Sequence, residues 1–534
     1  MLLFELIIGL LLVGALFSLL ANRIGVPYPA LLALVGAIIA LIPGVPTVVL
    51  DPELALALFV APTLLDAAFD ASPRDLRDNI SSVTSLAVAL VVLTVGAVAW
   101  AVHLVVPSIG WAPAIALGAI VAPPDASAAT AVLRRLKPPH RLLVILEGES
   151  LFNDATSLLV YRVAVGAAMT GAWAGWKVVP MLLLTCGGGV LAGWILARLF
   201  LWLIARVEDI PVTVLLQFLG TFAVWVLADR IGLSAIITMV AYAMTLARRV
   251  GGTQNARRKI ASYAVWDVAV LVLNVLAFVL IGLQLRGITT RVHGHEWRTY
   301  GLAAVAVCLA VVLVRIVWVS GFSAILRWKR LRFGNRGPRT LGIPTFGSIT
   351  VASWCGMRGI VTLATAIALP DGGHAFPHRD LIVFCAFCVV LTTLVLQGST
   401  LAPLMRRLCL HDDGTVEHEI TVARVEIARA ALRSLDAEDA APPHGDVLRA
   451  EYQARLQAAE SSEGSSADER SLAAMQRRAV LAQRTALAGL RASAVIGDDA
   501  LHAVEEELDV LELTADEVIR PTLTVPAPAP EARD

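Results

Sequence analysis

Long apolar segments, most of them roughly 17 to 28 residues, follow one another through the first 410 residues of this 534-residue chain. A helix needs about 20 apolar residues to cross the roughly 30 Å hydrocarbon layer of a bilayer. Only 16% of the residues are charged, whereas soluble globular domains contain about 25%. A transmembrane β-barrel would show alternating segments of about ten residues instead. The sequence therefore predicts an all-α polytopic membrane protein in contact with a lipid bilayer.

Hydropathy predicts thirteen transmembrane spans. They cover residues 2–21, 28–43, 53–70, 81–106, 111–134, 141–168, 178–206, 210–229, 232–248, 264–285, 301–320, 346–369 and 379–404. The first span has neither a basic region nor a small-residue cleavage site, so we interpret it as an uncleaved helix. Thirteen spans accommodate two inverted six-helix repeats, spans 1–6 and 8–13, and one linking helix.

The distribution of charge predicts two domains and a membrane orientation. Residues 1–410 carry a net charge of +13 and residues 411–534 a net charge of −13. With the N-terminus outside, the inner loops hold 21 Lys and Arg residues and the outer loops six. This bias favours a C-terminus in the cytoplasm. We expect the protein to lie in the plasma membrane. We expect a transmembrane domain over 1–410 and a cytoplasmic, helical, acidic tail over 411–534 with a regulatory role. Within the tail, the patterns predict amphipathic helices over 416–435 and 471–493, a Ser/Gly-rich linker over 461–466 and a disordered end over 521–534.

Acidic residues interrupt the sixth span. Glu147, Glu149 and Asp154 occur within eight residues, together with Ser150 and Asn153. Each ionised carboxylate near the bilayer centre costs about 2.5–3.5 kcal/mol on insertion scales. Such groups are retained where they pair with a cation, coordinate an ion or carry a proton. The run therefore predicts a transporter with an ion or proton site.

Two other spans are interrupted at corresponding positions of the proposed repeats. Span 5 contains Pro123 and Pro124, followed by Asp125, and proline breaks a helix. Span 12 contains Arg358 between Gly356 and Gly359. Inverted-repeat transporters place substrate sites where such discontinuous helices meet. We therefore expect Asp125 at the ion site.

Arginine at membrane depth needs an anionic partner because its guanidinium stays charged. For Arg358 the natural partner is Glu149 or Glu147. Arg162 and Arg315 either pair with a nearby acid or extend toward the interface.

Three further acids lie in or near other spans. Asp70 is close to a predicted inner end, where a carboxylate is unexceptional. Asp66 and Asp267 are open between a structural and a functional role.

Two carboxylates suit a hard monovalent cation, which prefers oxygen ligands. Asp125 and Asp154 would supply carboxylates, and Ser150 and broken-helix carbonyls would supply further oxygens. A carboxylate buried without a cation favours its neutral, protonated form. Cation and proton then compete for one group, and with alternating access this competition is sufficient for antiport.

The runs 122–126 (APPDA), 147–155 (EGESLFNDA) and 354–359 (WCGMRG) resemble the sodium–proton antiporters of the monovalent cation:proton antiporter-1 family. The resemblance covers about residues 1–410. It implies the inverted-repeat antiporter fold, a core domain moving against a dimerisation domain, a homodimer and a role in pH homeostasis.

The resemblance also implies roles for individual residues. Asp154 matches the ion- and proton-binding Asp of an Asn-Asp motif, and Asn153 matches its supporting neighbour. Asp125 matches a second carboxylate on the unwound helix, and Ser150 a hydroxyl ligand.

Further correspondences concern charge. Glu149 and Arg358 match a core pair that joins the two interrupted regions, with Glu147 as a possible additional member of the site. An Asn-Asp pair, rather than two acids, is similar to the electroneutral group. Related members often carry Thr before the Asp of the broken helix, but this chain has Pro124, so that hydroxyl ligand is absent.

Sodium–proton antiport is thus the expected function, with K⁺ or Li⁺ as alternative cations, no cofactor and no nucleic-acid partner. A K⁺/H⁺ antiporter is one alternative. An intramembrane aspartyl-type hydrolase is another, from a different class, although its Gly-x-Gly-Asp context is missing. A channel or anion carrier fits less well because acids outnumber Arg358 at the site. We therefore expect a transporter and no enzyme.

Overall fold

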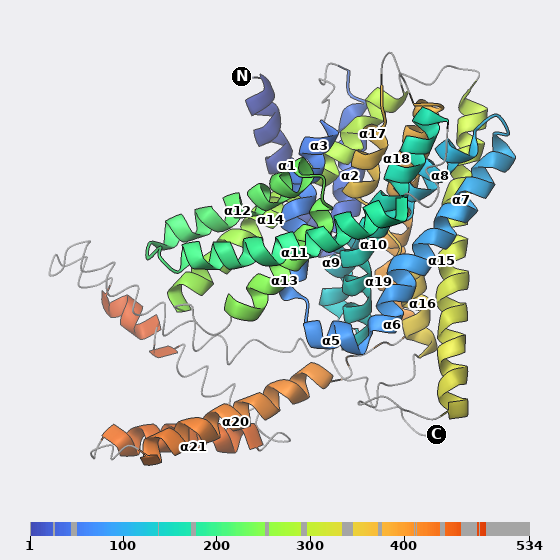
Figure 1. Cartoon of the computed structure of the whole chain (residues 1–534). Coiled ribbons are helices and arrows are strands. Elements are labelled where there is room, and N and C mark those ends of the chain that lie inside the picture. The colour runs from blue at the N-terminus through green and yellow to red at the C-terminus, as the bar shows by residue number, and fades with distance from the viewer. Residues whose placement is uncertain are drawn as a thin grey trace, which may run out of the picture. The chain divides into compact units, whose positions relative to one another are not determined.

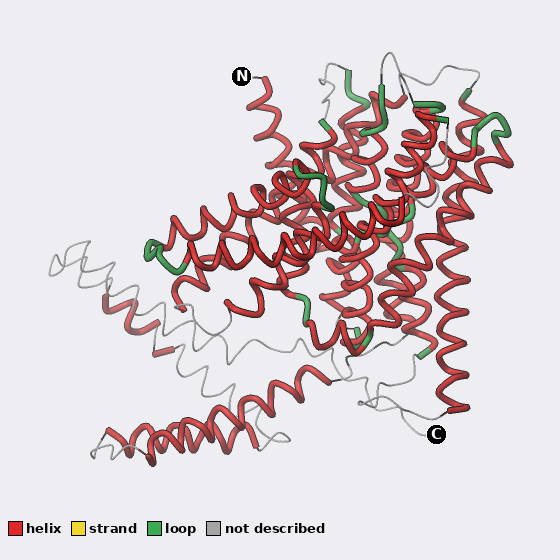
Figure 2. Tube along the Cα trace, viewed as in Figure 1, coloured by secondary structure: helices red, strands yellow, loops and turns green. Residues whose placement is uncertain are grey.

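The computed structural model describes residues 2–24, 27–43, 51–136, 138–171, 178–250, 256–289, 296–333, 345–371, 376–408, 410, 412, 414–437, 444–460, 478–479 and 481–487. All regular elements within these ranges are helical (Figure 2), which confirms the all-α prediction for them. The chain divides into two compact units, Met1–Asp413 and Gly414–Asp534.

The first unit consists of helices that pack against one another around apolar cores (Figure 1). In chain order they are α1 (Leu2–Ile24), α2 (Tyr28–Ala40), α3 (Pro52–Ala55), the π-helical η1 (Leu56–Val60), α4 (Ala61–Asp70), α5 (Pro73–Asp78), α6 (Ile80–Thr84), the π-helical η2 (Ser85–Leu90), α7 (Val91–Val105), α8 (Trp111–Val121), α9 (Ala126–Leu136), α10 (His140–Thr170), α11 (Val178–Ile204), α12 (Ile210–Arg230), α13 (Ala235–Val250), α14 (Ala256–Thr289), α15 (Trp297–Phe333), α16 (Phe346–Trp354), α17 (Ile360–Ile367), α18 (Arg379–Thr392), the π-helical η4 (Thr393–Gln397) and α19 (Gly398–Arg407).

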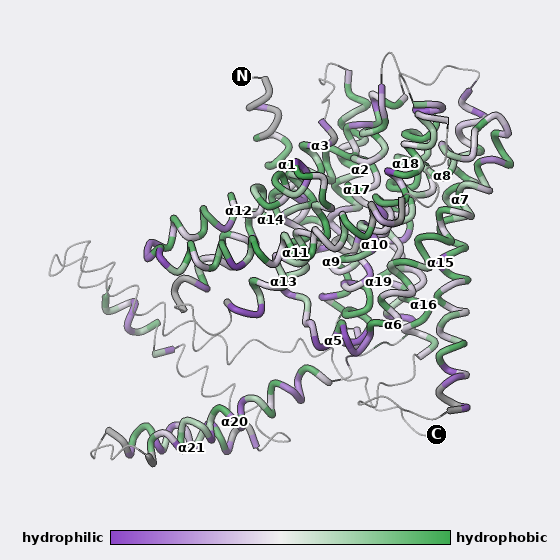
Figure 3. Tube along the Cα trace, viewed as in Figure 1, coloured by the Kyte–Doolittle hydropathy of each residue, from purple (hydrophilic) through white to green (hydrophobic). Residues whose placement is uncertain are grey.

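Several of these helices are suited to a bilayer by length and composition. Within the described residues, six stretches are long and apolar enough to cross it: Ile80–Val105, Leu183–Ile204, Ile210–Arg230, Lys259–Thr289, Trp297–Lys329 and Arg379–Arg407. Along α15, a stripe of apolar side chains from Leu302 to Val317 is between 55% and 70% exposed. Figure 3 shows the same hydrophobic character along much of that helix. A large apolar surface over a packed interior is expected of a multi-pass membrane protein.

Helix α10 is central to the first unit, since it packs against α8, α9, η2 and α16. Helix α8 in turn lies close to α7. A Cβ atom at Gly118 of α8 would lie 2.6 Å from the backbone oxygen of Val95, so only glycine permits this approach. Small residues of this kind allow membrane helices to pack backbone to backbone. The elements that carry the acidic run and the two interrupted spans are thus held together.

The second unit contains two paired helices, α20 (Thr415–Ala437) and α21 (His444–Glu460). Arg429 of α20 forms an ion pair with Glu460 of α21, with 2.8 Å between nitrogen and oxygen. Sequence patterns predicted a helix over 416–435, which α20 confirms, but they did not predict α21. The predicted linker (461–466) and disordered end (521–534) lie outside the described residues. So does most of the predicted helix over 471–493, of which only 478–479 and 481–487 are described.

Candidate functional site

Two of the predicted spans are helices broken in the middle. The first breaks between α8 and α9, where Pro123 and Pro124 cannot supply the backbone N–H groups that would continue a helix. The second breaks between α16 and α17, over residues 355–359. Broken backbone inside a membrane protein needs new hydrogen-bond partners. Both predicted interruptions are confirmed.

The two breaks bind to each other. The backbone N–H of Asp125 donates a hydrogen bond to the carbonyl oxygen of Met357, with 2.6 Å between nitrogen and oxygen. A Cβ atom placed on Gly359 would overlap the carboxylate of Asp125. The Asp125 side chain therefore lies directly against the second break, and only glycine at position 359 leaves room for it.

Arg358 binds the carbonyl groups released by the breaks. Its Nε donates to the oxygen of Val121 at 3.0 Å, its Nη2 to the oxygen of Ala122 at 3.2 Å, and its Nη1 to the oxygen of Gly356. The backbone N–H of Arg358 donates to Oγ1 of Thr393 at 3.0 Å. A helix C-terminus carries partial negative charge, so the guanidinium neutralises the end of α8.

Helix α10 places Asn153 and Asp154 beside the first break. The side-chain N–H of Asn153 donates to the carbonyl oxygen of Pro124 at 3.1 Å. Both side chains are buried, with 0% of Asn153 and 6% of Asp154 exposed. Asp125 is the charged group that acts on Asp154. Asp125, in the first break, and Asp154, on α10, therefore repel each other when both carboxylates are ionised.

The amide oxygen of Asn153 has no hydrogen-bond partner among the described residues. This Oδ1 atom is buried. Leaving a buried oxygen unpaired lowers stability by about 1–3 kcal/mol. This oxygen is therefore suited to coordinate a cation or to accept a hydrogen bond from a water molecule. The oxygen donors near the break are then the Asp125 and Asp154 carboxylates and this amide oxygen.

The predicted pair between Glu149 and Arg358 is wrong. Glu149 instead binds Arg315 of α15 through two parallel bonds, with Nη1–Oε1 at 2.5 Å and Nη2–Oε2 at 2.9 Å. The Nε of Arg315 also donates to the backbone oxygen of Ala352 in α16 at 3.1 Å. The physical reason is geometric, because broken-helix carbonyls occupy the guanidinium of Arg358 and a second buried arginine is available to the acid. The Glu149–Arg315 pair therefore joins α10, α15 and α16.

Glu147 lies apart from this pair. Its Oε1 is 3.1 Å from Nη2 of Arg134, which is also 3.9 Å from Asp70 of α4. Ser150 is half-buried and lies one turn before Asp154 on α10. The open question about Arg162 is answered by a surface ion pair with Asp229 at 3.5 Å.

The roles of two residues in this arrangement, Arg315 and Thr393, could not be predicted from the sequence. Arg315 was noted at membrane depth, but nothing in its spacing indicates Glu149, which is far away in the chain. Thr393 is one of four hydroxyl residues in the apolar span 379–404, and nothing in the sequence distinguishes it from Thr392, Ser399 and Thr400. Both depend on tertiary contacts between spans.

The donor set limits the chemistry. Within the described ranges, no cluster of three or more His, Cys, Asp and Glu side chains could hold a metal ion. Two carboxylates and an amide oxygen at a helix crossing suit one hard monovalent cation or a proton.

Comparisons with known proteins agree with this arrangement. A sequence model of the family described as "Sodium/hydrogen exchanger, transmembrane" matches residues 7–407. An uncharacterized Na(+)/H(+) exchanger of Mycobacterium tuberculosis (strain ATCC 25618 / H37Rv) is 31% identical over 96% of both chains. A sodium, potassium, lithium and rubidium/H(+) antiporter of Bacillus pumilus (strain SAFR-032) is 31% identical over 77% of this chain and 62% of its own length.

The fold also matches a solved structure. The sodium proton antiporter MjNhaP1 from Methanocaldococcus jannaschii at pH 8 superimposes with a TM-score of 0.59. The match covers 76% of this chain and 99% of that chain at 19% sequence identity. At this identity the likeness establishes the fold of the transmembrane unit.

Proposed function

Because the chain belongs to the sodium/hydrogen exchanger family, we propose that Asp125 and Asp154 form the site at which it exchanges a monovalent cation for a proton. Members of this family are secondary transporters, so the intramembrane hydrolase alternative does not hold. The site assignment rests on the position of both carboxylates at the crossing of the broken helices, since Asp125 lies against Gly359 and Asn153, the neighbour of Asp154, binds the carbonyl oxygen of Pro124.

Competition for one carboxylate accounts for exchange. Asp154 is buried, so its ionised form needs a compensating positive charge. A cation held by Asp154 and Asp125, with the Asn153 oxygen as a further ligand, supplies that charge. A proton on Asp154 supplies it equally well. The cation-bound and protonated states exclude each other. In each state the charge of Asp154 is compensated, so the protein can change between its inward-facing and outward-facing conformations.

The surrounding charges support an electroneutral exchange. Glu149 is neutralised by Arg315, and Arg358 supplies one fixed positive charge at the C-terminal end of α8. Replacing one bound cation by one proton on Asp154 then leaves the net charge of the site unchanged. We therefore propose one cation exchanged per proton.

Sodium is the proposed cation, with K⁺ and Li⁺ as alternatives. The Bacillus pumilus relative is named for four alkali cations. Pro124 has no side-chain hydroxyl, and its carbonyl oxygen already accepts the Asn153 hydrogen bond. Ligands beyond the two carboxylates must then come from the Asn153 oxygen, from Ser150 or from water. Such a set is less restrictive in cavity size than one with a fixed hydroxyl.

The finer architecture belongs to the same proposal. We propose thirteen spans arranged as two inverted repeats, with the broken helices at equivalent positions, because such an arrangement would permit alternating access around the midplane. We place the protein in the plasma membrane as a homodimer, with the N-terminus outside and the C-terminus in the cytoplasm. The acidic tail would adjust the activity, and the physiological role would be pH homeostasis.

Reconstituted vesicles test this function. A pH-sensitive dye trapped inside should report acidification of the lumen when sodium efflux drives proton uptake, and the signal should not change when valinomycin and K⁺ set the membrane potential. Repeating the measurement with K⁺ and Li⁺ ranks the cations. A rate that depends strongly on the potential would contradict the one-to-one exchange, and no proton flux with any cation would contradict the function.

A further inference from the structure

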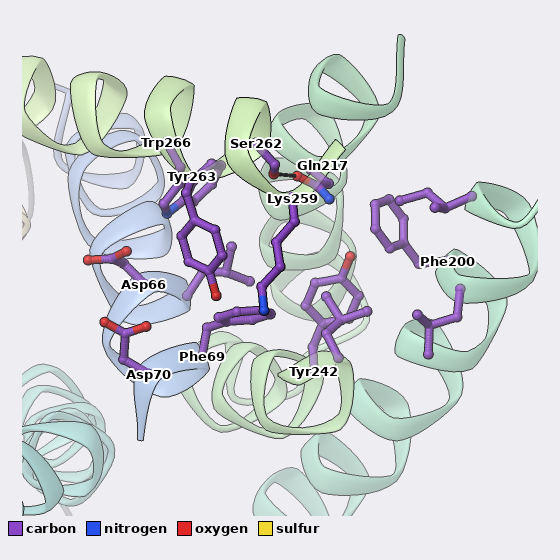
Figure 4. Close-up of a pocket in the computed structure, with 14 residues that line it drawn as sticks. Asp66, Phe69, Asp70, Phe200, Gln217, Tyr242, Lys259, Ser262, Tyr263 and Trp266 are labelled. Carbon is purple, nitrogen blue, oxygen red and sulfur yellow. Dashed lines mark hydrogen bonds between the residues drawn. The ribbon is translucent and has the colours of Figure 1, made fainter. Parts of the chain in front are cut away.

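A partly open cavity lies among α4, α11, α12, α13 and α14 (Figure 4). Asp125, Asn153 and Asp154 are not among the described residues that line it. It is therefore a separate place in the transmembrane unit at which a ligand can bind.

Aromatic rings make up much of the wall. Phe69 of α4 packs edge to face on Tyr263 of α14, with 6.2 Å between ring centroids. Phe200 of α11 does the same with Tyr242 of α13 at 5.8 Å. Trp266 of α14 completes this lining. Such rings accept an apolar body and attract a cation over their faces.

One edge of the cavity is acidic. Asp66 and Asp70 are four residues apart on α4, so they lie on one face of the helix (Figure 4). The side chain of Trp266 is a hydrogen-bond partner of Asp66, and the charged groups facing Asp66 are Asp70, Arg134 and Asp267. Arg134 lies closer to Glu147 than to Asp70, at 3.1 Å against 3.9 Å. The edge thus has more negative than positive charge.

An unpaired hydroxyl group points independently to a ligand. The Tyr242 side chain is only 1% exposed, and within the described residues its hydroxyl has no hydrogen-bond partner. Figure 4 shows this hydroxyl directed into the space between Lys259 and Phe200. Leaving a buried hydroxyl unpaired costs about 1–3 kcal/mol. A ligand or a water molecule in the cavity would remove that cost.

We propose that this cavity binds an amphipathic organic amine, with its ammonium group at Asp66 and Asp70 and its apolar body between the aromatic rings. The carboxylates supply charge, and the rings supply apolar area and attraction for the cation. The Tyr242 hydroxyl binds a polar group of the ligand or a water molecule bridging to it.

Lys259 allows an experiment to distinguish a positively charged ligand from a negatively charged one. This lysine lines the same cavity and is exposed. Its positive charge opposes a bound ammonium ion, whereas it would attract the phosphate of an anionic lipid headgroup. Removing this charge therefore strengthens binding of an amine and weakens binding of an anionic lipid.

The experiment uses the full-length protein in detergent and 1-naphthylmethylammonium as the probe, with binding measured by titration calorimetry. The neutral 1-naphthalenemethanol, of nearly the same shape, should bind at least tenfold more weakly. The double substitution Asp66→Asn and Asp70→Asn should weaken the amine at least tenfold, and Tyr242→Phe about threefold. Lys259→Gln should strengthen it, while Asp125→Asn, outside the cavity, should leave Kd within twofold.

Three results would overturn the proposal. Equal affinity for the amine and the alcohol would mean that the cavity recognises apolar shape alone. Weaker amine binding in Lys259→Gln would contradict a cation site and favour an anionic lipid headgroup. Loss of binding in Asp125→Asn would mean that the probe occupies the exchange site instead. The exposed position of Lys259 keeps that variant informative even if the double aspartate variant fails to fold.

Discussion

Removing the negative charge of Glu149 should destabilise the protein strongly. The Glu149 and Arg315 side chains are only 2% and 1% exposed, and each neutralises the other through two parallel bonds. In Glu149→Gln the Arg315 guanidinium remains charged, because arginine does not deprotonate in proteins. Breaking a buried pair by removing one partner costs about 3–5 kcal/mol. The expected loss is therefore a large part of the stability of an ordinary domain.

Glu147 provides a matched control two residues earlier on the same helix, α10. Its partner Arg134 is 58% exposed and Glu147 itself 24% exposed, so water screens the pair. Exposed pairs contribute about 0–1 kcal/mol. Glu147→Gln should therefore change stability far less than Glu149→Gln, although both substitutions remove one negative charge from α10.

Thermal unfolding in detergent, followed by tryptophan fluorescence at one fixed scan rate, measures this difference. The melting temperature should fall much further in Glu149→Gln than in Glu147→Gln. The double substitution Glu149→Leu and Arg315→Met should recover most of the loss, because it leaves no unpaired charge. Equal melting of the two single variants, or a double variant worse than Glu149→Gln, would refute the reasoning.

Three further predictions follow from the helix crossing and the tail. Gly359→Ala should reduce exchange in vesicles at least tenfold, because its Cβ overlaps the Asp125 carboxylate, whereas Gly301→Ala, which has open space around it, should not; similar rates for both would contradict the overlap. Asn153→Ala should lower stability by about 1 kcal/mol through the lost bond to Pro124, measured by thermal unfolding, and an unchanged melting temperature would count against that bond. Deleting residues 415–534 should leave exchange intact, and any shift in its pH dependence should shrink with added salt, since screening acts over about 8 Å; a folded truncation without exchange at any pH would assign the tail to the transport machinery.

The broken helices could be predicted from the sequence because their causes are local. Pro123 and Pro124 remove backbone donors wherever they occur, and a charged residue such as Arg358 between glycines in an apolar span marks an interruption. The position of Asp125 beside the first break follows from the same local chemistry. Membrane insertion adds a strong constraint, since apolar length alone separates spans from loops.

The choice of charge partners could not be predicted in this way. Glu149 had two buried arginines within reach of a plausible pairing, and only the packing of α15 against α16 places Arg315 at the acid. Arg358 was unavailable because carbonyl groups of the broken helix α8 bind it. Such pairings depend on distances between spans remote in the chain, which periodicity does not encode. The aromatic cavity beside Asp66 likewise requires five helices to converge.

The most direct test of the account is cation–proton exchange by Asp154→Asn in reconstituted vesicles. Asparagine has nearly the same shape but can neither release a proton nor balance a bound cation. The variant should insert and melt like the wild type, yet show no sodium-driven proton flux at any pH. Asp154→Glu, which restores an ionisable carboxylate, should recover part of the flux. Retained exchange by a folded Asp154→Asn variant would contradict the assignment of Asp154 as the group for which cation and proton compete.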